Sequence, residues 1–558
     1  MLQLIEMSKV SKYLNEHLQG EVTVRQAIRR EFSHDASILK VAPEMVIYPR
    51  LTSDIRKVAR FSYQLAEKGH KLPITPRGAG SDQTGGAVGS GIILNFTAHM
   101  DAILEVDAKQ RLVRLQPGVT FKTLNQALRL HGLWVPAYPR SHAYSTIGGA
   151  IANNSSGVFS GKYGSIFQYV KQLEVVLSNG EVLQTGRLSK RELNKIKGEQ
   201  SFEGEVYRNI DNLINDNDEA LDKLAIDVRD NIGYNLVDVK RRDGSIDLTP
   251  LFIGSQGTLG IVSEVILQAE PIPQQPLVGA VAFASMNDTR DALDFLGQLN
   301  PAVLEVIDAR VVERAVQNGY KYDFYTEATQ NDNKIEAIVV MEFDDDSGRA
   351  KKKIAKKIEK YFKESSAYVV LEQDDSKTID IRLLENLPAL ATIPENGGLT
   401  EFGALSGVYV APDQLEAFMN AIQELEKKYK VELPLVGHAT QGVYEARVQL
   451  DMTKPADRQK ALKLVAEWAV MVYAHGGHMI GEAGEGRLKS IFAYKEVGKE
   501  ITQLYSAVRD IFDPLGTMNT GVKQVVEASK YADALKKLVD GTRTDYDGTD
   551  FVNYVEGD

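Results

Sequence analysis

The residues best suited to chemistry in this 558-residue chain lie in a small, polar stretch from Pro139 to Gly164. The stretch contains the pair Gly148 and Gly149, then adjacent asparagines, adjacent serines and further glycines. Glycine lets a backbone approach a ligand closely, and successive free N–H groups form a concave nest that binds an anion. The stretch therefore predicts a phosphate-binding loop.

Two more glycine-rich loops flank this stretch, at residues 76–91 and 252–265. Each of the three loops adjoins an apolar run that predicts a strand, at residues 92–96, 173–177 and 261–267. Three such loops indicate one long ligand, and the alternative is that they are ordinary turns of a β-rich domain. No Gly-x-Gly-x-x-Gly opens a helix after a strand and no Gly-Lys-Ser/Thr occurs, so neither a Rossmann nor a P-loop nucleotide site is predicted.

Composition limits the class of protein. The length predicts two or three domains, and 43% hydrophobic with 25% charged residues is ordinary for a folded chain. The net charge of −11 argues against a nucleic-acid partner. The absence of cysteine excludes disulfides, thiolate metal sites and cysteine-ligated iron–sulfur clusters in this chain. No apolar run of about 18 residues and no secretory signal is present, so we expect no transmembrane segment and a cytoplasmic location.

The elements that must position the loops follow from periodicity. Residues 1–40 predict a helical lead-in, and Asn179-Gly180 predicts a hairpin turn. Three prolines, at 271, 273 and 276, predict a domain boundary. Beyond them strands and helices alternate to about residue 437, which favours an antiparallel sheet backed by helices and an α+β fold.

Five motifs in order carry a resemblance to a known family: PRGAGSDQTGG, QPGVTFKTLNQAL, TIGGAIANNSSG with KYG, GSQGTLGIVSE and DPLGTMNTG. Together they resemble the FAD-linked oxidases of the vanillyl-alcohol oxidase (PCMH-type) superfamily over roughly residues 43–523. Within it the chain is most similar to the D-lactate, glycolate and D-2-hydroxyglutarate dehydrogenases. The resemblance implies a PCMH-type FAD-binding domain of two α+β subdomains, followed by an antiparallel-sheet cap domain that binds substrate. The expected domains are a lead-in (1–40), the FAD domain (41–275), the cap (276–500), a return to the flavin (501–525) and an acidic tail (526–558).

The same resemblance implies the cofactor contacts. The residues expected along FAD are Arg77, Gly78, Ala79, Gly80, Ser81, Asp82, Pro139, Ser141, Thr146, Ile147, Gly148, Gly149, Ala152, Asn153, Ser156, Gly157, Gly257, Gly260, Ile261, Val262 and Asn519. Relatives that bond flavin covalently often place a histidine where Ser81 stands, and the chain has no cysteine. Noncovalent FAD is therefore expected.

The second half resembles the family's metal and base motifs only in part. His438 and Glu482 match family metal ligands, whereas Glu445 and Ala483 stand where the second ligand histidine and the catalytic histidine belong. If residues 477–482 are extended, alternation brings His478 to the face of Glu482. The set His438, Glu445, His478 and Glu482 then has the nitrogen and oxygen chemistry that suits zinc or a similar divalent metal. The alternative is a set of scattered polar residues in a site that has lost its metal.

These residues give the expected reaction. By resemblance the chain is an FAD-dependent dehydrogenase that oxidises a D-2-hydroxy acid such as lactate by hydride transfer to flavin. His478 and Glu482 would serve catalysis, and Arg382 would hold the substrate carboxylate, unless it is a surface arginine. The segment 392–403 lacks a lysine that some relatives use.

Two other functions stay open, namely an FAD oxidoreductase with a shifted substrate, such as a sugar or another alcohol, and a noncatalytic flavin subunit of an electron-transfer complex. The expected partners are the small 2-hydroxy acid and an unidentified electron acceptor, a quinone or a protein. A homodimer is left open. The basic segment 349–365 predicts a solvated helix, with a peripheral membrane contact as the alternative.

Overall fold

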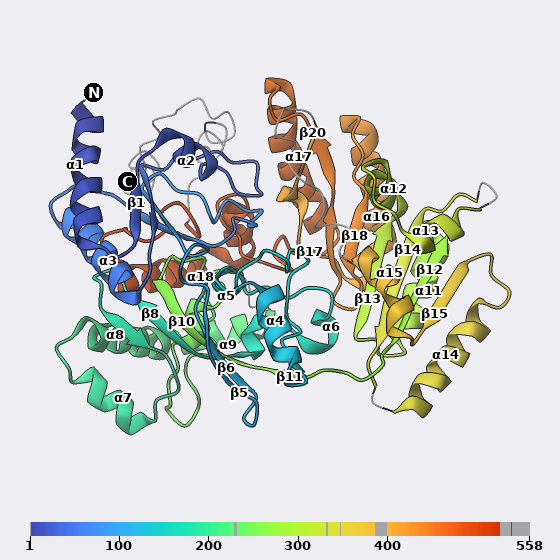
Figure 1. The fold of residues 1–558 in the computed structure, drawn as a ribbon, viewed down its shortest axis with the longest axis horizontal. Coiled ribbons are helices and arrows are strands. Elements are labelled where there is room, and N and C mark those ends of the chain that lie inside the picture. Colours follow the sequence, from blue (N-terminus) through green and yellow to red (C-terminus); the bar gives the residue numbers. More distant parts are fainter. Residues whose placement is uncertain are drawn as a thin grey trace.

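The computed structural model describes residues 2–227, 232–330, 333–345, 347–385, 399–524 and 537. Figure 1 shows two parts side by side, a blue-to-green part built from the first half and a yellow-green-to-orange part built from the second. A red segment from near the C-terminus lies within the first part. The expected acidic tail lies outside the described residues, apart from Lys537, as does most of the segment 392–403.

The first sheet carries the first glycine-rich loop. Its strands follow the order β1-β2-β4-β3, and β4 pairs in parallel with both β2 and β3. The loop begins directly after β3. The elements of this layer are α1 (Leu2–His17), β1 (Glu21–Thr23), α2 (Gln26–Glu31), β2 (Met45–Tyr48), α3 (Thr52–Glu67), β3 (Ile74–Arg77) and β4 (Ile92–Asn95).

The lead-in joins this layer through a buried carboxylate. Asp54 accepts hydrogen bonds from the backbone N–H groups of Gln19 (2.9 Å), Gly20 (3.0 Å) and Arg50 (3.0 Å). Leu14 and Leu18 pack into the same core. The sequence predicts a helix capped near Ser53 or Asp54. The helix is present as α3, which begins after Leu51, but the capping role is wrong, because Asp54 binds the preceding segment instead.

A second, antiparallel sheet carries the other two loops, in the order β5-β6-β10-β8-β9. Side chains of β10 alternate between buried and half-buried, which is typical of a sheet covered fully on one face. Its strands are β5 (Ile103–Asp107), β6 (Leu112–Leu115), β8 (Val170–Val176), β9 (Val182–Gln184) and β10 (Ile261–Gln268), and β7 (Leu133–Trp134) pairs with β11 (Glu270–Pro271). The helices are α4 (Phe121–Arg129), α5 (Ile147–Asn153), α6 (Ser160–Tyr163), α7 (Lys190–Lys197), α8 (Phe202–Asp216), α9 (Asp218–Asp227) and α10 (Thr249–Phe252).

The second part is built on a seven-stranded antiparallel sheet in the order β15-β12-β14-β13-β18-β19-β17. Every residue of β12 and β14 is buried, because helices cover both faces of the sheet. The strands are β12 (Leu277–Phe283), β13 (Val303–Asp308), β14 (Ala337–Phe343), β15 (Tyr368–Glu372), β17 (Val408–Tyr409), β18 (Leu435–His438) and β19 (Val443–Ala446), with β16 (Thr400–Phe402) paired to β20 (Val448–Leu450) beside it. This is the expected antiparallel cap, although the sequence did not predict β13 as a strand.

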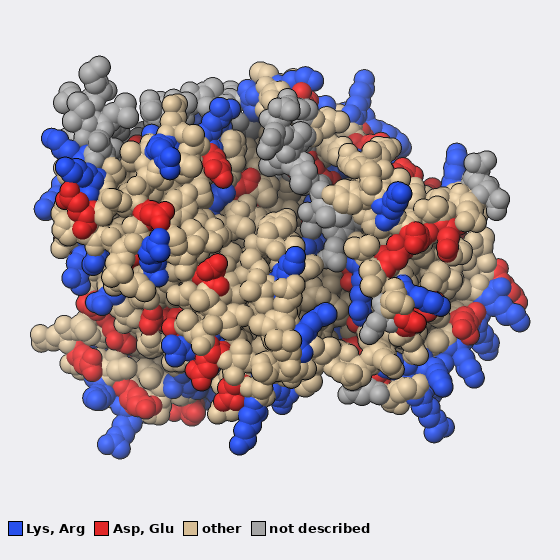
Figure 2. Space-filling view, viewed as in Figure 1, with Lys and Arg blue, Asp and Glu red and all other residues tan. Residues whose placement is uncertain are grey.

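One face of the cap sheet packs against α11 (Met286–Gly297), α14 (Gly348–Phe362), α16 (Leu415–Tyr429) and α17 (Pro455–Ala474). The other packs against α12 (Ala309–Gln317), α13 (Asp323–Ala328) and α15 (Asp375–Glu385). Basic side chains project at the right-hand end of the molecule, where α14 lies (Figures 1 and 2). Ile358 and Phe362 of α14 are buried against the sheet, which favours the solvated-helix interpretation over a membrane contact. Among the residues that the structure describes, no helix has the length and low polarity needed to cross a membrane.

After the cap, α18 (Ser490–Phe512) returns the chain to the first part. Met518 pairs with Ile74 of β3, and the Asn519 side chain donates to the carbonyl oxygens of Gly86 (2.8 Å) and Gln256 (2.6 Å). Lys523 forms a fully buried ion pair with Glu485. Asn519 thus fixes two glycine-rich loops. The expected domain boundaries at 275 and 500 stay predictions, and residue 500 lies within α18.

Candidate functional site

A large cavity opens between the two parts of the chain. The cavity volume is about 280 Å³, and about 1940 Å³ when the open solvent around it is counted. One end is lined by the glycine-rich loops and the other by charged residues of the cap. Predicted cofactor residues that line it are Arg77, Gly78, Ala79, Gly80, Ser81, Asp82, Pro139, Ser141, Thr146, Gly148, Gly149, Ala152, Asn153, Gly257, Gly260 and Val262.

Five predicted cofactor residues, Ile147, Ser156, Gly157, Ile261 and Asn519, are not among the residues lining the cavity in the described part of the chain. Each of the five either lies next to a residue that lines the cavity or hydrogen-bonds to such a residue. Ile147 and Ile261 belong to the core below the loops, and Ser156 hydrogen-bonds Glu482. These residues therefore support the cavity from behind.

The loop after β3 has the form of an anion nest. Among the described residues, no hydrogen bond uses the backbone N–H groups of residues 78–81. Gly80 has a φ of +77°, and its carbonyl oxygen accepts from the backbone N–H of Ala36 (3.1 Å). The Nε of Arg77 is also buried without a partner in the described structure. Several hydrogen-bond donors of this loop are therefore available to bind a negatively charged group.

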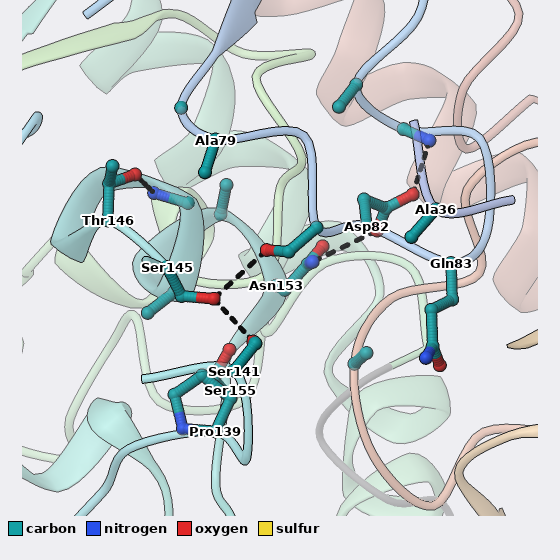
Figure 3. Close-up of a pocket in the computed structure, with 18 of the residues that line it drawn as sticks. Ala36, Ala79, Asp82, Gln83, Pro139, Ser141, Ser145, Thr146, Asn153 and Ser155 are labelled. Carbon is teal, nitrogen blue, oxygen red and sulfur yellow. Dashed lines mark hydrogen bonds between the residues drawn. The ribbon is translucent and has the colours of Figure 1, made fainter. Parts of the chain in front are cut away.

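Side chains join this loop to its neighbours across the cavity, as Figure 3 shows. Asn153 donates from Nδ2 to Asp82 Oδ1 (3.0 Å), and Asp82 also accepts from the backbone of Thr84 (2.9 Å). The Ser145 hydroxyl lies 3.0 Å from that of Ser81 and 2.5 Å from that of Ser141. The loops are therefore positioned as one unit.

This end of the cavity fits FAD. A Cβ at Gly78 would lie 2.1 Å from Thr146 Oγ1, so only glycine lets the first loop lie this close to the second. The free N–H groups and Arg77 have the chemistry to hold a pyrophosphate. The small residues Gly148, Gly149 and Ala152, which also line the cavity, suit close contact with the rest of a dinucleotide.

A buried carboxyl behind the nest makes stability depend on pH. Burial, with the charge of Asp82, raises the pKa of Asp35 to about 7. The folded state keeps a proton that the unfolded state loses above about 3.8, so this stabilisation is complete at low pH and disappears as pH rises through about 7. We expect Asp35→Asn to flatten this decline in the free energy of unfolding, measured by urea titration on both sides of neutrality. Exposed Asp101→Asn is the control, and equal slopes in Asp35→Asn and wild type would contradict the assignment.

The cap side of the cavity holds a group of charged side chains, named here the Arg140 cluster: Arg140, Glu305, His438, Glu445, Arg447 and Glu482. All of them except Glu305 line the cavity. Glu305 of β13 and His438 of β18 face each other as paired strand residues, and Glu445 follows on β19. Arg140 reaches them from the long loop of the first part. All the cluster side chains except Glu482 are nearly inaccessible to solvent, so their charges must be paired.

The pairing is continuous. Arg140 donates to Glu305, and from Nη1 to Glu445 Oε1 (2.5 Å), which also accepts from Arg447 Nη2 (2.7 Å). His438 Nδ1 lies 2.5 Å from Glu305 Oε1, and its Nε2 lies 3.4 Å from Glu482 Oε2. The cluster therefore joins the two parts of the chain through ion pairs.

These contacts set the protonation states. Burial alone would lower the pKa of His438, but Glu305 and Glu482 outweigh it and raise that pKa to about 9. Burial opposes ionisation of Glu482, yet its hydrogen bond and charge interaction with His438 lower its pKa to about 2. At neutral pH the pair is an imidazolium and a carboxylate, and the carboxylate side chain is the more accessible of the two.

Two predicted catalytic residues lie elsewhere. The strand expected at 477–482 is reduced to a single bridge between Tyr409 and His478, so strict alternation does not apply. His478 pairs with Glu496 and stacks on Tyr409 rather than lining the cavity. Arg382 binds Glu342 (3.0 Å) and is likewise not among the lining residues.

The expected metal ligands do not fit a metal. His438, Glu445 and Glu482 all line one cavity. However, Glu445 pairs with the guanidinium groups of Arg140 and Arg447, while His438 and Glu482 pair with each other. Within the described ranges no group of three or more histidine, cysteine, aspartate or glutamate side chains converges as a metal site would require. The expectation of a zinc-like centre is therefore not supported.

Sequence reasoning missed Arg140, Glu305 and Arg447. Glu305 could have been noticed as a carboxylate inside VLEVID, an apolar run with the pattern of a fully buried strand. Arg140 gave no comparable signal, because it stands within a loop whose glycines dominate the pattern and its partners lie 165 and 305 residues away.

Comparison with known proteins agrees with this architecture. Residues 43–186 match the model of an FAD binding domain, and residues 272–522 match that of the C-terminal domain of FAD linked oxidases. The fold is similar to that of 4-ethylphenol oxidase from Gulosibacter chungangensis, with a TM-score of 0.67, 16% identity and coverage of 93% of this chain and 97% of that one.

Two curated relatives are similar at the sequence level. D-2-hydroxyglutarate dehydrogenase of Haemophilus influenzae is 25% identical over 95% of this chain and 53% of its own length. Glycolate oxidase subunit GlcD of Bacillus subtilis is 27% identical over 90% of this chain and 93% of its own. The chain thus spans about half the length of the D-2-hydroxyglutarate dehydrogenase it matches. With both halves matched, and with the loops and cap arranged as described, the chain belongs to the FAD-linked oxidoreductases of the vanillyl-alcohol oxidase (PCMH-type) superfamily.

Proposed function

We propose that the chain oxidises a D-2-hydroxy acid, lactate-like in size, to the 2-oxo acid. The observation that carries this proposal is that the anion nest and the Arg140 cluster open into one cavity. A dinucleotide held by the nest would extend toward a set of charged groups able to bind a small acid. The similarity to hydroxy-acid dehydrogenases supports the same substrate class.

The glycine-rich loops would hold the cofactor. Residues 78–81 would donate to the pyrophosphate with Arg77 beside them, while the small residues near Gly148 would let the chain lie close to the dinucleotide. FAD, when bound, supplies an acceptor for the hydride that leaves the substrate carbon.

Arg140 and Arg447 are our candidates for binding the substrate carboxylate, because both line the cavity and Arg382 does not. A planar guanidinium matches a carboxylate well. Both arginines already pair with Glu445, so a substrate carboxylate would share their charge. We expect this sharing to favour small, singly charged acids.

Glu482 is our candidate base. The hydroxyl proton passes to its carboxylate as the α-hydrogen leaves with the bonding electrons, so the substrate loses two electrons and two hydrogens. A carboxylate with a pKa of about 2 is a weak base toward an alcohol. The hydroxyl becomes strongly acidic as the hydride departs, however, and the His438 imidazolium holds Glu482 in place.

An anaerobic panel of hydroxy acids tests the reaction. Bleaching of the flavin absorbance by D-lactate or a close D-2-hydroxy acid supports the proposal. Bleaching only by other alcohols or sugars would favour the second candidate, a shifted substrate, which is suggested by Ala483 on the cavity wall and by Glu445 bound to two arginines. No bleaching by any compound, with a stable partner in pull-downs, would favour a noncatalytic flavin subunit. The proposal also includes a quinone or protein as electron acceptor and a cytoplasmic location.

We further expect FAD to be bound without a covalent link. Ser81 is engaged with Ser145, and the chain contains no cysteine that could attack the flavin. Precipitating the yellow protein with acid should therefore release the flavin into the supernatant. Yellow colour that stays with the denatured pellet would contradict this expectation.

A further inference from the structure

We propose that the Arg140 guanidinium is the resident cation of the cluster, and that this site works without a divalent metal. The inference concerns the same site as the proposed function. It rests on that function in only one of its tests, the effect of EDTA on flavin reduction. Its basis is the position of Arg140, which lies between Glu305 and Glu445, the second of which is an expected metal ligand.

Arg140 connects strands of the cap that are not adjacent in sequence. Its two terminal nitrogens bind different carboxylates, Glu305 on β13 and Glu445 on β19. The Arg140 side chain is 11% exposed, against 1% for Glu305 and 13% for Glu445. The guanidinium therefore occupies the interior of the cluster and is no surface counter-ion.

Several of the lone pairs that a metal would need are already in use. Glu445 Oε1 accepts from Arg140 and from Arg447, at 2.5 and 2.7 Å. Glu305 gives one oxygen to Arg140 and the other to His438 Nδ1. The remaining histidine nitrogen, Nε2, faces Glu482. A metal bound by His438, Glu445 and Glu482 together would therefore either lie beside the guanidinium of Arg140 or displace it.

Moving it out is costly for two reasons. A guanidinium stays charged in proteins, so it cannot vacate the cluster by losing a proton. A buried carboxylate that loses its partner destabilises the protein strongly. A divalent ion beside the retained guanidinium would in turn meet a like charge at close range. The fixed cation and a metal are therefore alternative occupants of the same space.

The first experiment uses the unmodified full chain, purified without chelators. We expect metal analysis to find zinc and manganese well below one equivalent per chain, and the melting temperature to be unchanged by added Mn²⁺ or Zn²⁺. If a 2-hydroxy acid reduces the flavin, dialysis against EDTA should leave the rate unchanged. One equivalent of metal, a melting temperature raised by either ion, or a rate lost to EDTA and restored by metal would each overturn the inference.

The second experiment removes the guanidinium. Arg140→Ala should lower the melting temperature and make it respond to Mn²⁺ or Zn²⁺, because a ligand that binds only the folded state raises stability. Lys162→Ala is the matched control, since Lys162 also joins the two parts through a buried partner, Asp344, but lies outside the cavity lining. A metal response of Arg140→Ala alone supports the inference, and a response in neither variant or in both contradicts it.

If Arg140→Ala does not fold, Arg140→Lys keeps the charge without the two-pronged shape and should fold without responding to metal. A metal response in that variant would count against a resident cation. Failure of every hydroxy acid to reduce the flavin would remove the proposed reaction. The metal content and the melting temperatures would still test the role of Arg140 in that case, because neither measurement depends on turnover.

Discussion

Replacing Gly78 with valine is expected to give a protein that purifies largely without FAD. A Cβ at this position would lie 2.1 Å from Thr146 Oγ1, and Thr146 caps α5 through its hydrogen bond to Gly149 N–H (3.2 Å). Either the first loop or the start of α5 must therefore shift. Overpacking of this kind costs roughly 1–3 kcal/mol, which corresponds to about a 5- to 150-fold weaker affinity. The absorbance ratio of flavin to protein, followed by titration with FAD, measures the loss.

Gly297→Ala is the control for Gly78→Val. It also adds a side chain to a glycine, but no atom lies within 4 Å of the new Cβ at the end of α11. The flavin content of this variant should equal that of wild type. A Gly78→Val protein with full flavin content would mean that the two loops do not lie this close around the cofactor.

Glu482→Gln is expected to slow flavin reduction by about 10²–10⁴-fold, the usual contribution of a positioned acid or base. Glutamine keeps the size of the side chain but cannot take the hydroxyl proton. FAD content should be unchanged, because the N–H groups expected to bind the pyrophosphate belong to residues 78–81 and not to Glu482. Anaerobic stopped-flow measurement of flavin bleaching, at saturating substrate, separates this rate from binding.

His478→Gln is the informative companion to Glu482→Gln. The sequence favours His478 as the base, whereas the structure pairs it with Glu496 away from the cavity lining. We expect the rate of flavin reduction to stay near that of wild type in this variant. A large loss in His478→Gln with little change in Glu482→Gln would return the role to the histidine.

The loop end of the site could be predicted from sequence, because its information is local. Gly78, Gly148 and Gly257 stand in continuous glycine-rich motifs, and each motif adjoins a strand that the apolar pattern also indicates. The conformation of such a motif depends mainly on its own residues, so it can be predicted from the local sequence. Sixteen of the expected cofactor residues consequently line the cavity.

The charged end could not be predicted in the same way, because its geometry depends on pairing between distant strands. Glu305 meets His438 only through the register of β13 and β18. The placement of His478 beside Glu482 assumed a regular strand at a point where the chain bends around Gly476 and Gly481. Alternation reports side-chain direction only along regular strands.

The return of residues 513–523 to β3 bears on how the protein is made. Multidomain chains usually complete their first domain while later residues are still being synthesised. Here Asn519 secures the carbonyl oxygens of Gly86 and Gln256, and Ile74 donates its N–H to the Thr517 carbonyl (2.8 Å). We therefore expect the cofactor loops to reach their final arrangement only after nearly the whole cap has been synthesised. FAD should accordingly bind only when synthesis of the chain is nearly complete.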